Sequence, residues 1–105
     1  MNSERHLFRV RSSTPPSVEI DTQASAVYVR FKRAAVAKTI PQGGELMHIA
    51  IDLDSRGEVV GIEAVGAKQF NIGAILQYAR VQAPKSLVAK ARYVPAELAV
   101  AGGMD

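Results

Sequence analysis

The sequence has 105 residues, of which 48% are hydrophobic and 22% charged, with a formal net charge of +3 and no cysteine. This composition predicts one compact domain and excludes disulfides, thiolate metal sites and a cysteine nucleophile. The longest stretch without a charged residue, 69–79, is far shorter than the roughly 18 apolar residues of a membrane span. No apolar run follows the N-terminal arginines, so we expect a cytoplasmic protein with no membrane association.

Residues 1–17 are polar and end in Pro15 and Pro16, which predicts a flexible or partly ordered N-terminal arm with a short strand at Leu7–Arg11. Residues 18–101 are predicted to form a single α+β domain, and residues 102–105 a frayed C-terminus.

Apolar side chains then alternate with polar ones, the period that places one row on each face of a strand. The pattern predicts strands at Val18–Ile20, Val27–Phe31, Val36–Ile40, Met47–Leu53 and Val59–Val65. For the last two strands we expect a hairpin with a four-residue loop, Asp54–Gly57, because it sets Ile49 opposite Ile62 and His48 opposite Glu63. A three-residue loop, Ser55–Gly57, would instead pair Asp54 with Glu58 and set Ile49 opposite Glu63. Gly61 and Gly66 fit either a bulge or a close approach of another segment.

A helical period appears only after these strands. Asn71 can cap a helix whose apolar stripe is Ile72, Ile75, Leu76 and Ala79, and Pro84 is expected to end it. Segment 86–93 is compatible with a short helix or a strand, and Pro95 could open a final turn through Ala101. The predicted fold is therefore α+β, an antiparallel β meander of four to five strands packed against one or more C-terminal helices.

The predicted core combines alternate strand residues with the helical stripe. Its members are Val27, Val29, Phe31, Ile49, Ile51, Val60, Ile62, Ile72, Ile75 and Leu76. Seven further apolar residues are left on the margins or the opposite face: Val18, Ile20, Val36, Ile40, Leu46, Val59 and Val65.

Two stretches resemble the YuzE-like family of small bacterial proteins, a domain of unknown function. Val18–Phe31 is similar to the family's opening, an Asp, a short polar turn and an apolar-Tyr-apolar strand. Ile51–Glu63 is similar to its closing hairpin of Asp-apolar-Asp, a Gly turn and Val-Gly-Ile-Glu. The chain departs from the family at Ser25, where an acidic residue is usual. The resemblance covers residues 18–68 and implies a β meander, no assigned reaction, and in some members a small partner-binding role beside toxin-like genes.

His48, Asp52, Asp54 and Glu63 are the polar set with side chains suited to metal binding or acid–base catalysis. Strand alternation places the first three on one face, and the hairpin could add Glu63. They would nevertheless spread over about 20 Å of strand, whereas a metal ion needs convergent ligands. A solvated face with one His–Glu pair is the favoured interpretation, so no catalytic residue, metal or other cofactor is assigned.

The basic residues Arg30, Lys32, Arg33 and Lys38, with Tyr28 among them, are the candidates for nucleic-acid binding. Charge is segregated along the chain: net +4 over residues 1–44, −4 over 45–67 and +3 over 68–105. This alternation favours self-pairing or a charged protein partner over uniform attraction to phosphate, so nucleic acid is the less favoured partner.

These observations favour a non-enzymatic protein-interaction module that forms a homodimer. The resemblance to the YuzE-like family implies that this module could act like an antitoxin. The alternatives are a metal-dependent or acid–base enzyme and a nucleic-acid binder, using the two residue sets above. Dimerisation is expected because one helix of about 11 residues, about 16 Å long, cannot cover a sheet about 20 Å wide. Cover by the C-terminal segment Leu87–Val100 within one chain is the competing explanation.

Overall fold

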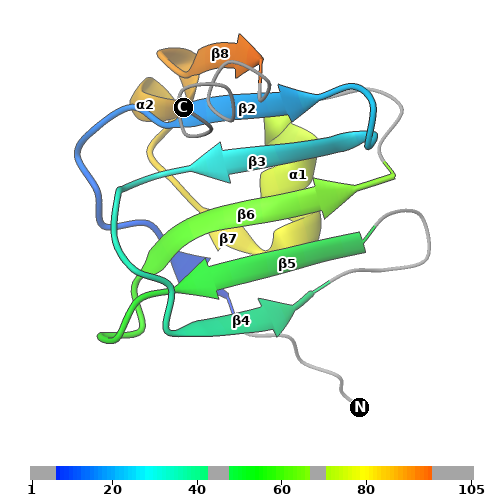
Figure 1. Ribbon diagram of the computed structural model, residues 1–105. Coiled ribbons are helices and arrows are strands. Elements are labelled where there is room, and N and C mark those ends of the chain that lie inside the picture. Colours follow the sequence, from blue (N-terminus) through cyan, green and yellow to red (C-terminus); the bar gives the residue numbers. More distant parts are fainter. Residues whose placement is uncertain (1–6, 43–47, 67–70, 96–105) are drawn as a thin grey trace, which may run out of the picture.

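The protein folds as a six-stranded, mostly antiparallel sheet with its helices on one face, as the computed structural model shows (Figure 1). The structure describes residues 7–42, 48–66 and 71–95. The α+β class is therefore confirmed. In chain order the elements are β1 (Phe8–Arg9), β2 (Ser17–Asp21), β3 (Ala26–Arg30), β4 (Lys38–Pro41), β5 (His48–Leu53), β6 (Val59–Val65), α1 (Ile72–Ala79), β7 (Val81–Gln82), α2 (Lys85–Ala89) and β8 (Arg92–Pro95).

The strand order of the sheet is β4-β5-β6-β3-β2-β8, so it is more than the predicted meander of four to five strands. The hairpin β2-β3 and the three-stranded antiparallel run β4-β5-β6 join through antiparallel pairing of β3 with β6. β8 returns from the C-terminal side and adds to β2 in parallel. A separate parallel pair, β1 with β7, ties the N-terminal arm to the chain after α1.

The hairpin β5-β6 has a different register from the predicted one. Its turn is closed by the Asp54 amide, which donates to the Glu58 carbonyl at 2.9 Å, so the loop has three residues, and Gly57 takes the left-handed φ of +82°. Leu53 then pairs with Val59, but Asp52 pairs with Gly61. The prediction of a four-residue loop was wrong, and Ile49 lies opposite Ala64 instead of Ile62.

A β-bulge at Val60 reconciles this loop with the apolar rows. Val59 and Ile62 both belong to the core although they are three positions apart, and a straight strand would turn one of them outward. The extra residue restores the alternation, so Ile51 faces Ile62. The Val60 carbonyl accepts from two consecutive amides, those of Phe31 at 2.8 Å and Lys32 at 3.3 Å.

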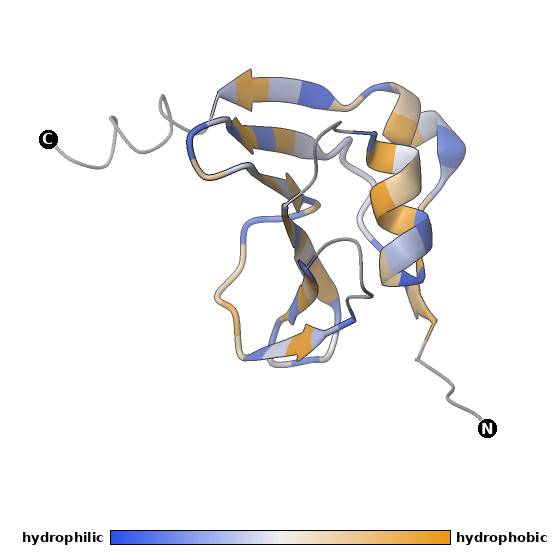
Figure 2. Cartoon of the chain, turned by 90° about the vertical axis from the view of Figure 1, so that its right-hand side faces the viewer, coloured by the Kyte–Doolittle hydropathy of each residue, from blue (hydrophilic) through white to orange (hydrophobic). Residues whose placement is uncertain are grey.

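The hydrophobic core lies between the sheet and α1. The side view shows α1 lying along one face of the sheet (Figure 2). Nine of the ten predicted core residues are buried, and Ile72 is half-buried. Val60 is buried outside the main cluster. Val18 and Val59, which we expected at the margins, belong to the core, together with Val10, Leu53, Ala64, Ala79 and Val81. Because Val10 is 8% exposed, the packed unit begins before the predicted boundary at residue 18.

Helix α1 begins as the sequence predicts, with the Asn71 side chain accepting from the Ala74 amide at 3.1 Å. It ends at Ala79, where Arg80 adopts a left-handed conformation, and not at Pro84. Pro84 instead precedes α2, so segment 86–93 is helical first and then extended. Buried Gln42 donates its side-chain amide to the Ala79 carbonyl at 2.8 Å and so links β4 to the end of α1.

The chain itself covers part of the sheet face that we expected a dimer to cover. Val88 of α2 and Ala91 pack against the core, as do Phe8 and Ala83 near the β1-β7 pair. This agrees in part with the alternative that residues after Leu87 supply the cover. The predicted turn through Ala101, Leu46 and the frayed C-terminus lie outside the described residues.

Candidate functional site

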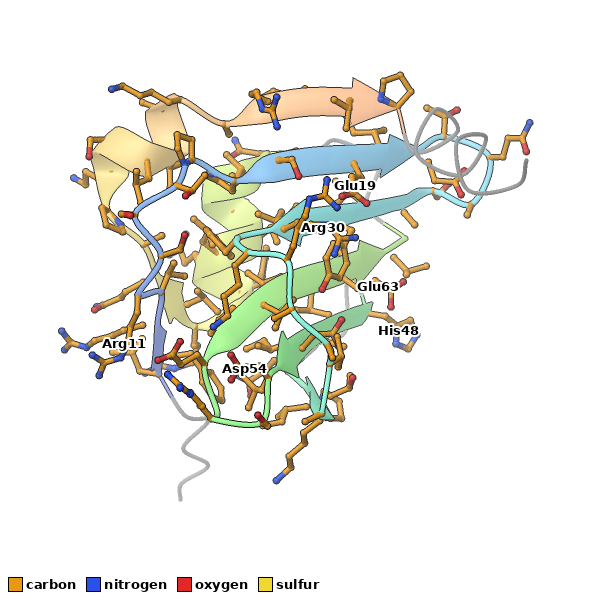
Figure 3. The ribbon with its side chains drawn as sticks, turned by 60° about the vertical axis from the view of Figure 1, so that its left-hand side comes forward. Arg11, Glu19, Arg30, His48, Asp54 and Glu63 are labelled. Carbon is orange, nitrogen blue, oxygen red and sulfur yellow. The ribbon has the colours of Figure 1, made fainter. Side chains whose placement is uncertain are left out.

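The open face of the sheet carries a chain of polar contacts that crosses five strands. Asp52 on β5 accepts from the Thr39 hydroxyl on β4 at 2.6 Å and from the Tyr28 hydroxyl on β3 at 2.9 Å. The Arg30 guanidinium lies 4.9 Å from the centre of the Tyr28 ring and is held by Glu19 on β2 at 2.7 Å. Figure 3 shows Glu19 and Arg30 directed toward each other on this face. The groups therefore bind one another across the sheet.

Gly61 makes this chain of polar contacts possible. It lies on β6 between the strands of Tyr28 and Asp52, and a β-carbon at this position would overlap the Tyr28 ring. The ring can therefore cross β6 only because residue 61 has no side chain. Burial of the phenol, and then its hydrogen bond to Asp52, raise the pKa of Tyr28, so this hydroxyl stays protonated and acts as a donor.

A second polar cluster closes the β5-β6 hairpin. The Asp54 carboxylate accepts from the backbone amides of Arg56 and Glu58, both at 2.9 Å. It also lies 2.5 Å from the Lys32 ammonium, which contacts the Glu58 carboxylate at 2.8 Å. The hydrogen bond from Lys32, and then those from the turn amides, lower the pKa of Asp54 to about 2. These bonds fix the turn.

The structure does not bring the predicted metal or acid–base set together. Asp52 is bound by two hydroxyls and Asp54 by the hairpin turn, so each is committed to a different cluster. His48 lies opposite Val65, and Glu63 lies opposite Ala50, so the predicted His48–Glu63 pair is wrong. In Figure 3 both side chains lie on the open face of the sheet, near the end of β5 and β6 that is away from their hairpin turn. Within residues 7–42, 48–66 and 71–95, no three acidic or histidine side chains are placed to hold a metal ion.

A pocket of about 290 Å³ lies where β3 ends and β2 and β8 begin. We call it the arginine pocket, and its lining is Thr14, Pro15, Ser17, Arg30, Phe31, Lys32, Arg33 and Arg92. Four of these eight residues are basic and none is acidic. Ser17 is the register partner of both Arg30 and Arg92, so these three residues form one row across neighbouring strands.

The predicted nucleic-acid candidates separate into two kinds. Arg30 and Lys32 line the pocket, but Arg30 is paired with Glu19 and Lys32 with both Asp54 and Glu58. Arg33 also lines the pocket and is exposed, whereas exposed Lys38 begins β4 and is not part of the lining. Sequence reasoning missed Arg92, Ser17 and Thr14. The signal for Arg92 was the unresolved choice between helix and strand over 86–93, because only the strand places it beside Ser17.

A third surface lies at the edge of the sheet, along β8. Tyr93 is 55% exposed, and with Ile20, Thr22, Val94 and Pro95 it lines a shallow, mainly apolar pocket of about 300 Å³. We call this the β8 edge surface. Tyr93 pairs with Val18 in register and so lies on the same face as the core, beyond its margin.

Comparison with known proteins adds no match. A scan against protein-family models finds none, and searches of curated proteins and of solved structures also find none. The resemblance to the YuzE-like family therefore stays a prediction. No helix among the described residues is long and apolar enough to cross a membrane.

Proposed function

We propose that the protein is a small, non-enzymatic protein-interaction module that associates with a second copy of itself through the β8 edge surface. The observation that carries the proposal is the exposure of Tyr93. This aromatic residue is 55% exposed and lies beside Ile20 and Pro95 at the margin of the sheet. Exposed aromatic residues in an apolar setting are typical of interface anchors.

The state of the reactive side chains supports a role without catalysis. A general acid or base needs a free position from which to exchange a proton with a substrate. Asp52 and Asp54 instead hold neighbouring strands and the hairpin turn through two or more hydrogen bonds each. Tyr28, whose raised pKa opposes ionisation, serves the same cross-strand network.

The chemistry of β8 favours contact through side chains over extension of the sheet. Pro95, its last residue, has no amide proton to donate and blunts the edge against continuous pairing. An isologous contact would place Tyr93 of each protomer against the Ile20 and Pro95 of the other, and so bury the same surface twice.

The test is light scattering after size exclusion on the unaltered protein and on two variants. We expect twice the chain mass of 11.3 kDa for the unaltered protein and 11.3 kDa for Tyr93→Glu. Val36→Glu is the matched control, because Val36 is also exposed, at 48%, but lies in the loop before β4. A mass of 11.3 kDa for the unaltered protein, or a dimer in all three samples, would contradict the proposed surface.

A further inference from the structure

We propose that the arginine pocket binds the dianionic phosphoryl group of a phosphomonoester. This site is separate from the β8 edge surface, and the inference does not depend on the proposed dimer. Its elements are the two guanidinium groups of Arg33 and Arg92 and the two hydroxyl groups of Thr14 and Ser17.

The four basic residues of the pocket differ in whether a carboxylate pairs with them. Arg30 is engaged by the Glu19 carboxylate through two contacts, at 2.7 and 3.3 Å. Lys32 contacts the carboxylates of Asp54 and Glu58. For Arg33 and Arg92, in contrast, no acidic partner is found in the described part of the chain. Among the described residues, the pocket therefore presents two guanidinium groups that have no acidic partner.

The fold holds the segments that carry these groups. The Arg92 amide donates to the Pro16 carbonyl at 2.9 Å, which fixes the start of β8 beside β2. On the other side, Phe31 is 2% exposed and anchors the chain immediately before Lys32 and Arg33. The buried Pro16 keeps the segment leading into Ser17 extended. The sheet and the core thus hold the backbone segments that carry Arg33 and Arg92.

A phosphomonoester has the charge and the hydrogen-bond acceptors that fit this pocket. Guanidinium groups bind phosphoryl oxygens through paired, charge-assisted hydrogen bonds, and hydroxyls can donate to the remaining oxygen. A phosphomonoester carries close to two negative charges above its second pKa of about 6, which matches the two free arginines. A carboxylate or a phosphodiester carries only one. The pocket volume of about 290 Å³ is near the lower limit for small-molecule sites, so it suits a compact phosphorylated group.

The test is calorimetric titration of the full chain with phenyl phosphate at about pH 7.5, above the second pKa of a phosphomonoester. We expect saturable binding with one site per chain, weakened about tenfold or more in Arg33→Gln and in Arg92→Gln, because each loses a charge-assisted hydrogen bond. Arg56→Gln is the matched control, since Arg56 is an exposed arginine outside this pocket, and its affinity should stay within about twofold. Equal weakening in all three variants would mean diffuse attraction and would overturn the site.

Lowering the pH provides a second, independent readout. At about pH 5 most of the phenyl phosphate is singly charged, so its apparent affinity should fall about tenfold. Sulfate keeps both charges at either pH and reports any titration of the nearby carboxylates, Glu19, Asp54 and Glu58. If sulfate and phenyl phosphate lose affinity equally at the lower pH, the cause is a change in the protein. That result would contradict the proposed match between two arginines and a doubly charged ligand.

Two further ligands distinguish the sources of the phosphoryl group. Phosphoserine binding like phenyl phosphate would extend the site to phosphorylated side chains, and tighter binding of phenyl phosphate would favour a small metabolite; both outcomes support the site. Binding of a single-stranded oligonucleotide at equal strength with and without its terminal phosphate would show attraction to the phosphodiester backbone and overturn the proposal.

Discussion

Replacing Gly61 with alanine tests the chain of polar contacts that crosses the open face of the sheet. The added β-carbon would overlap the Tyr28 ring, which must then move away from Asp52. Loss of a hydrogen bond to a charged acceptor costs about 1.5–3 kcal/mol. Rearrangement of a crowded side chain costs about 1–3 kcal/mol. The lower backbone entropy of alanine returns about 0.5–1 kcal/mol, so we expect a net loss of about 3 kcal/mol in the free energy of unfolding.

The free energy of unfolding lost in Gly61→Ala should depend on the presence of the Tyr28 ring. In a Tyr28→Ala background the overlap is absent and the hydrogen bond has already been removed, so Gly61→Ala should be neutral or stabilise by up to about 1 kcal/mol. Urea unfolding of the unaltered protein, both single variants and the double variant gives the coupling energy directly.

Gly66→Ala is the control for this cycle. Gly66 has a φ of +92° with open space where a β-carbon would lie, so alanine there is strained by its backbone alone, by the same amount in both backgrounds. Equal costs of Gly61→Ala with and without the Tyr28 ring, to within about 0.5 kcal/mol, would refute the proposed role of the glycine.

Three further predictions concern stability. Phe31→Ala should lower the free energy of unfolding by about 3–5 kcal/mol, because Phe31 is 2% exposed, whereas Arg30→Ala should cost clearly less; equal melting temperatures would mean that the strand faces are reversed. The folded-state pKa of Asp54, about 2, is below its unfolded value of about 3.9, so this group stabilises the protein above about pH 4 and the benefit disappears toward pH 2; thermal melts of Asp54→Asn should lack that acid dependence. Burial raises the pKa of Tyr28, so the stability that this group contributes is present below its unfolded pKa of about 10 and declines as the pH rises above that value. In an ultraviolet titration of the folded protein, Tyr28→Phe should remove a phenol that ionises only at a raised pH.

Local pattern was sufficient for most of the elements. Val59–Val65 was predicted with the observed bounds, because alternating β-branched residues between turn signals define a strand without reference to distant residues. The Asn71 cap and the stripe through Ile75 and Leu76 identified α1 for the same reason. Register was not accessible in this way. A bulge at Val60 changes the pairing by one residue, and its cause, the need to bury both Val59 and Ile62, exists only when the sheet meets the core.

The candidate sites divide along the same line. The alternation of side chains was enough to predict that Asp52 and Arg30 lie on the polar face of their strands, because side-chain direction follows from position along one strand. The contact of Tyr28 with Asp52 across Gly61, and the row of Arg92, Ser17 and Arg30, depend instead on how distant strands pair. Those neighbours come from strands up to 75 residues apart in the chain, from Ser17 to Arg92, and their proximity depends on strand order, which long-range packing selects and no local periodicity encodes.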